Sequence, residues 1–192
     1  MDKAKASDNC GATVQRNALF TEDARAYGKY HVVCRDAEGR IKWKDVAVNK
    51  ITDAGLKLME DTILAGSAFT ATCYLGLAGT GTKAAADTQA SHAGWLEVGA
   101  TNDPDYTAPR KTITFSAASG SGTVTKASTG TYTFAMLNAG TVAGCFININ
   151  GSSTIDNTTG TLFSAGDFSG GSKTVGNGDS LTVTYTLSIA AS

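Results

Sequence analysis

The chain has 192 residues and a formal net charge of −1 at neutral pH, with 16 Lys and Arg against 17 Asp and Glu. This length is enough for one ordinary domain with its own hydrophobic core. The balanced charge leaves no electrostatic footprint for nucleic acid or an anionic membrane, so we predict neither as a partner.

No segment approaches the roughly 20 consecutive apolar residues of a membrane-spanning helix. Residues 1–5 lead into polar sequence rather than the apolar core of a signal peptide, so we expect the protein to be made and folded in a cytoplasm. Cys10, Cys34, Cys73 and Cys145 are widely spaced without a C-x-x-C pair, which is typical of neither a metal site nor a dense disulfide framework. We predict that the last three are buried within strands.

Residues 1–24 are polar and show no sustained hydrophobic periodicity. They are predicted to form an extended N-terminal arm, in which the apolar pair Leu19 and Phe20 can anchor the arm on a partner. The alternative is a terminus that contacts nothing.

Residues 25–66 are predicted to form a β-hairpin and one short α-helix that contact a partner. Two β-rich runs, 27–35 and 40–48, flank a four-residue Asp/Gly turn. Tyr27, Tyr30 and Trp43 present aromatic rings among mixed charges, a combination that suits a protein interface better than a base-stacking platform.

The helix is predicted to follow a cap at Thr52 or Asp53 and to end before Gly66. A stripe of apolar residues is expected to face the protein and to plug one end of the following β-domain. Its members are Leu56, Met59, Ile63 and Leu64.

Residues 67–192 are predicted to form the body, an antiparallel β-sandwich of jelly-roll or immunoglobulin-like type. Period-two alternation recurs in runs separated by Gly, Asn and Ser clusters, which gives seven or eight strands. The clearest run is 181–189, where five large apolar residues share one face and Thr and Ser occupy the other.

One long irregular connection, from about Thr80 to Pro109, holds His92, Trp95 and Tyr106, which we predict as candidates for partner or glycan contact. His92 lies near an Asp and a Ser, but three such residues within six positions of a loop rarely reach the geometry of a catalytic triad. The nearby Asp103 and Asp105 supply too few oxygens for calcium. We therefore predict no catalytic residues, no metal and no cofactor, and a protein that is not an enzyme.

Several segments resemble small virion structural proteins of tailed bacteriophages, and together they cover nearly everything after residue 25. The matching segments are 30–66, 74–77, 86–95, 110–119, 142–147, 160–166 and 175–183. The resemblance implies a virion part without a catalytic motif, and it is nearest to capsid decoration or cement proteins. It implies the major capsid protein and further copies of this chain, as a homotrimer or other homo-oligomer, as partners on the head surface.

Two alternatives stay open at this point. A tail fibre, baseplate or adaptor subunit that binds host glycans would use the aromatic residues of the long connection. A secreted adhesin or carbohydrate-binding module is disfavoured by the polar N-terminal sequence.

Overall fold

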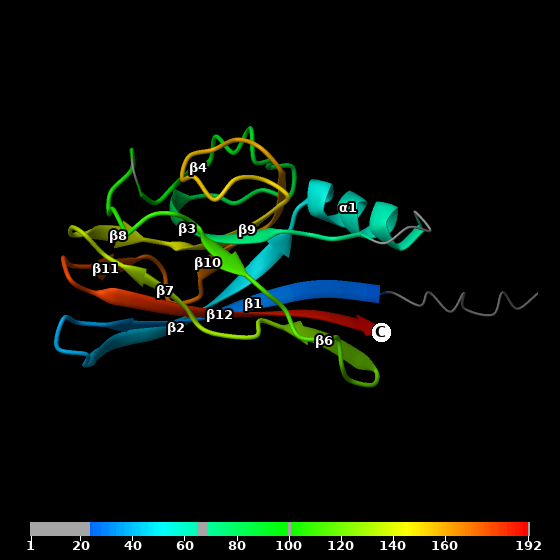
Figure 1. Ribbon diagram of the computed structural model, residues 1–192, viewed down its shortest axis with the longest axis horizontal. Helices are drawn as coiled ribbons and strands as arrows, with labels where there is room; N and C mark the ends of the chain where they lie inside the picture. Colours follow the sequence, from blue (N-terminus) through cyan, green and yellow to red (C-terminus); the bar gives the residue numbers. More distant parts are fainter. Residues whose placement is uncertain (1–23, 65–68, 100, 192) are drawn as a thin grey trace, which may run out of the picture.

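The computed structural model describes residues 24–64, 69–99 and 101–191, which form a mainly β protein with one helix (Figure 1). The elements in chain order are β1 (Ala24–Arg35), β2 (Ile41–Ile51), α1 (Asp53–Leu64), β3 (Cys73–Gly81), β4 (Trp95–Glu97), β5 (Lys111–Ile113), β6 (Thr123–Ala127), β7 (Tyr132–Ala135), β8 (Gly140–Val142), β9 (Gly144–Ile149), β10 (Thr161–Phe168), β11 (Lys173–Val175) and β12 (Ser180–Ala191).

The main sheet runs in the order β4-β3-β9-β10-β2-β1-β12-β6, with β5 also on β3 and β7 also on β12. Every pairing in it is antiparallel. The sheet folds over so that the layer of β3, β9 and β10 packs against the layer of β1, β2 and β12, which confirms the predicted antiparallel sandwich (Figure 1). The segment after β5 joins the layers a second time, because Ser116 donates its N–H to the carbonyl of Ala127 and Thr129 donates its N–H to the carbonyl of Thr114.

The predicted hairpin is present as β1 and β2, with Asp36 accepting the backbone N–H groups of Glu38 and Arg40 in the turn. It is not a separate unit, however. β1 pairs with β12 along its whole length and β2 pairs with β10, so the hairpin lies in the middle of the sheet. The expected division between residues 25–66 and 67–192 therefore does not correspond to two bodies.

The helix begins as predicted, with the Thr52 hydroxyl oxygen accepting the N–H of Gly55 at 3.0 Å. The expected buried stripe is wrong for most of its length. Gly55 is the buried residue of the helix and lies so close to β10 that an added Cβ would sit 2.3 Å from the Phe163 carbonyl oxygen. This close approach turns Leu58 and Met59 partly onto the core, while Leu56, Ile63 and Leu64 are exposed.

The main core lies between the two layers and includes inward residues of β3, β9 and β12. In the closing strand, Leu181, Val183 and Tyr185 are fully buried, as predicted, but Leu187 is only half-buried and Ile189 is exposed. Cys34, Cys73 and Cys145 are buried and unpaired, as predicted. Within the described part of the chain, the core-facing residues of β12 thus become more exposed toward the end of the strand.

Candidate functional site

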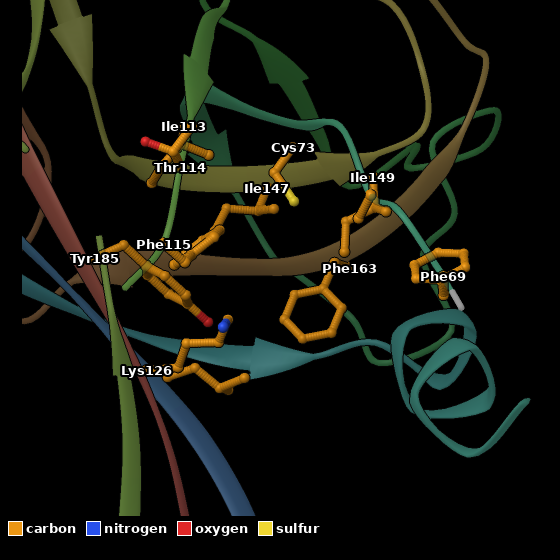
Figure 2. A pocket seen from close by; sticks show the side chains of 12 residues that line it. Phe69, Cys73, Ile113, Thr114, Phe115, Lys126, Ile147, Ile149, Phe163 and Tyr185 are labelled. Carbon is orange, nitrogen blue, oxygen red and sulfur yellow. The ribbon is translucent and has the colours of Figure 1, made fainter. Parts of the chain in front are cut away.

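An apolar cleft of about 520 Å³ opens between the layers at the end where α1 and the last residues of β12 lie (Figures 1 and 2). We call this part of the molecule the open end: the cleft, the exposed residues of α1, and the ends of β6 and β12. Its volume falls within the range of sites that take a ligand or a partner's side chains.

Both layers supply the walls of the cleft. Ile149 of β9 and Phe163 of β10 form one side, and Tyr185 of β12 forms the other (Figure 2). Leu187 of β12 also lines the cleft. Phe115, which follows β5, closes a third side and packs edge-on against Tyr185 with 6.1 Å between ring centroids. These residues point inward because successive side chains of a strand alternate between its faces.

Lys126 of β6 is the one residue with a charge at neutral pH that lines this cleft, within the described part of the chain. It pairs in register with Leu187, so both side chains lie on the same face of the sheet and point toward the cleft. Its ammonium donates one hydrogen bond, 2.9 Å long, to the carbonyl of Ser116. Two N–H groups of an ammonium with three donors therefore remain for a partner.

Tyr185, which lines the cleft, belongs to a group of buried polar side chains that hydrogen-bond one another in pairs. The amide of Asn49 donates to the Tyr185 hydroxyl at 3.0 Å, and Tyr30 hydrogen-bonds the hydroxyl of Ser164 at 2.8 Å. Burial raises the pKa of Tyr185 to about 12 and raises the pKa of the Cys73 thiol, which also lines the cleft.

Exposed apolar side chains lie on α1, on the segment after it, and on β6 and β12. Ile63 and Leu64 at the end of α1 are 74% and 83% exposed, and Phe69 is 44% exposed. Val124 and Ile189 pair on β6 and β12, two residues along from the pair Lys126 and Leu187, and are also exposed. Such a concentration of large apolar residues is characteristic of an interaction surface.

The structure places the three aromatic residues predicted for a hairpin interface apart from one another in their burial. Tyr30 is fully buried in the core and contacts Tyr185, while Trp43 is half-buried, packs at a tilt against Phe168 and donates its indole N–H to the Thr174 carbonyl. Tyr27 is half-buried and lies on the opposite face of β1 from Tyr30. Leu19 and Phe20 lie outside the described residues.

The three residues predicted in the long connection cover the molecule's own sheet. Trp95 and Tyr106 are buried; Trp95 packs on Phe146 and Tyr106 packs edge-on against Phe134. His92 stacks on Trp95 and its Nδ1 contacts the Trp95 carbonyl oxygen at 3.0 Å. These rings are occupied within the chain, so they do not offer a platform for a sugar.

Trp95 and Phe146 belong to a second hydrophobic cluster on the outer face of β3, β9 and β10, which we call the loop-covered face. Here the long connection lies over the sheet. A fully buried ion pair anchors it: Arg110 donates from Nε to Glu97 Oε1 at 2.7 Å, and Glu97 also accepts the N–H of Asp156. No sequence pattern singled out this pair, because its partners are separated by irregular chain.

The polar residues examined for catalysis or metal binding are also used internally. Asp87 accepts the Trp95 indole N–H and the N–H of Ala84, and Asp103 accepts the side-chain amide of Asn138. Within the described ranges, no cluster of three or more His, Cys, Asp or Glu residues could hold a metal ion. The same ranges contain no helix with the length and apolarity to cross a membrane.

No protein-family model, curated protein or solved structure matches this chain. The function is therefore inferred from the residues that line the cleft and from the geometry of the open end. Sequence inspection missed the cleft, although two signals bear on it: the unbroken alternation of β12 to its end, and a lysine within a short alternating strand.

Proposed function

We propose that this chain is a non-enzymatic structural protein of a bacteriophage virion, a decoration or cement protein that binds the outer surface of the head. In this role it bridges neighbouring major capsid protein subunits. It works by adding many modest protein contacts, which together stabilise a lattice through multivalency.

The observation that carries the proposal is the open end. Phe69 lines an apolar cleft that has one cation and no carboxylate among its described lining residues, and Ile63 and Leu64 are exposed a few residues earlier in the chain. Apolar contact area with few charges at its centre is the composition of a protein interface. This chemistry suits a protein that holds other proteins together.

The body of the molecule also supports a structural role. The long strands β1 and β12 pair over twelve residues, and the outward face of β12 carries Thr182, Thr184 and Thr186 instead of charged groups. A continuous antiparallel sheet of this kind satisfies its backbone groups internally. Such a sheet resists local opening where many copies share a mechanical load.

A tail location remains the second candidate, but the aromatic residues of the long connection no longer support glycan binding there. The aromatic rings that would stack on a sugar, Trp95 and Tyr106, are buried under other side chains. A fibre, baseplate or adaptor subunit would dock through the same open end. Copy number separates the two locations, since a decoration protein is present in a fixed ratio to the capsid protein and a tail subunit in few copies.

The test compares phage particles produced with and without this chain. We expect particles that lack it to assemble but to lose DNA at lower temperature, and added purified protein to restore both occupancy and stability. Quantitative gel densitometry should give a fixed ratio to the capsid protein. Particles that never contain the chain, or particles with the same thermal stability in its absence, would overturn the proposal.

A further inference from the structure

The open end combines a projection and a recess on one surface. The projection is the last turn of α1, where Ile63 and Leu64 are exposed, and the recess is the cleft, which Phe69 lines five residues after Leu64. Figure 2 shows α1 next to Phe69 and Phe163, two residues that line the cleft.

We propose that the open end binds a second copy of this chain in a two-fold pair, with the last turn of each α1 inserted into the cleft of its partner. The inference rests on the proposed function only in taking the open end as a protein-docking surface. The further step is that a second copy of this chain binds that surface.

Shape is the first argument for a second copy. In a two-fold interface the same patch is used by both subunits, so a patch must complement itself. A surface with an apolar projection and an apolar recess side by side meets this requirement, because one reciprocal insertion covers both features in both copies. An unrelated partner would have to supply a matching projection and recess of its own.

Charge is the second argument. The last turn of α1 carries no basic residue, and Glu60 and Asp61 are exposed immediately before Ile63. The C-terminal end of a helix also carries partial negative charge. Insertion of this turn brings negative charge toward Lys126, whose ammonium has free donors at the recess.

The apolar content is the third argument. Ile63 and Leu64 would contact the aromatic and aliphatic walls formed by Phe115, Phe163 and Leu187. Central, fully desolvated apolar anchors contribute most of the energy of an interface. Isolated helix ends in solvent do not stabilise the fold, so the exposure of these two side chains is explained by the pair.

The experiment measures molar mass by sedimentation equilibrium over a range of protein concentrations, with no phage heads present. We expect the wild-type chain to form dimers. The double variant Ile63→Asp, Leu64→Asp should weaken association at least about 30-fold and keep an unchanged circular dichroism spectrum. The matched control is Leu137→Asp, which also replaces an exposed apolar residue (56% exposed) but lies away from the open end; it should dimerise normally.

A monomeric wild-type chain, a trimer, or a double variant that still dimerises would overturn the two-fold pair. Head occupancy distinguishes this failure from failure of the proposed function. If the wild type is monomeric and binds heads while the double variant does not, then the open end binds the capsid and the decoration role stands. If the chain dimerises and never enters particles, then the pair stands and the decoration role fails.

Discussion

The loop-covered face and the open end are both apolar surfaces outside the main core, and the chain treats them differently. Over the first, the long connection buries Trp95 against Phe146 and is fastened by Glu97 and Arg110. At the second, the described residues leave Ile63 and Leu64 exposed and do not cover the apolar cleft that Phe69 lines.

The difference shows that the loop-covered face is already covered within one copy of the chain, whereas the described residues leave the open end uncovered. A surface covered by the chain's own loop and locked by a buried ion pair contributes to stability and cannot admit a partner without losing that pair. An apolar surface without such cover loses few contacts within the chain when it binds a partner, and the binding buries additional apolar area. Substitutions should therefore change folding at the loop-covered face and association at the open end.

The largest expected effect is at the loop-covered face. Arg110→Met should lower the free energy of unfolding by about 3–5 kcal/mol, because it leaves the buried Glu97 carboxylate without its partner. Urea unfolding followed by fluorescence measures the change. As the control, Arg40→Met removes the exposed ion pair with Asp36 and should cost far less than Arg110→Met. Equal costs for the two variants would contradict the role given to the buried pair.

The next effect lies where the helix meets the sandwich. Gly55→Ala should destabilise the protein by about 1–3 kcal/mol, since the new methyl group would sit 2.3 Å from the Phe163 carbonyl oxygen and force α1 away from β10. It should also weaken dimerisation by displacing the projection. Gly130→Ala is the matched control, because nothing lies within 4 Å of its added Cβ. Thermal denaturation gives the melting temperature of both variants. Equal melting temperatures for Gly55→Ala and Gly130→Ala would contradict the close packing of α1 on β10.

A smaller effect is expected from the one cation of the described cleft lining. Lys126→Met should change the free energy of unfolding by less than about 0.5 kcal/mol, since the ammonium makes one exposed hydrogen bond. It should weaken the dimer by up to about fivefold and flatten the salt dependence of association. Sedimentation at low and moderate salt measures both. An unchanged salt dependence would remove the charge argument for the pair.

The smallest effect concerns the reactivity of one thiol. Cys73 lines the cleft, and burial raises the pKa of its thiol, so it should react slowly with a maleimide at neutral pH. In a Cys10→Ser background, the Ile63→Asp, Leu64→Asp variant should react about two- to fivefold faster, because the cleft is no longer filled. Mass spectrometry resolves Cys73 from Cys145, which lies in the main core and should not change. Identical Cys73 rates in the variant and the parent would indicate that the cleft is never occupied by the helix.

Much of the fold could be predicted from local pattern. Alternation predicted the buried residues Leu181, Val183 and Tyr185, and the Asp/Gly turn and the Thr52 cap predicted the hairpin and the start of the helix. These features depend on neighbours within a few residues, which a sequence displays directly.

The position of the hairpin and the face of the helix depend on distant residues. β1 and β2 became central strands because β12 and β10, more than a hundred residues later, pair with their outer edges. Tyr30 was therefore buried rather than presented. Leu56, Ile63 and Leu64 face away from the core because α1 approaches β10 closely through Gly55, on the helix face that also carries Leu58 and Met59.

The candidate site could not be predicted for the same reason. Its walls come from β9, β10, β12 and the segment after β5, and the inward direction of Lys126 follows from the pairing of β6 with β12. A one-residue change of that register would move Lys126 to the outer face. The sequence shows the alternation within β6 and β12, but it does not show which residues of the two strands pair.

Cross-linking tests the two-fold pair most directly. A Leu64→Cys, Val124→Cys variant in a Cys10→Ser background places one thiol on the projection and one on β6, two residues from Lys126, which lines the recess. Under mild oxidation, a non-reducing gel should show a covalent dimer, and Leu64→Cys combined with Leu137→Cys should remain monomeric. If only monomer forms from the first variant, or both variants cross-link equally, then α1 does not enter the cleft of a second copy.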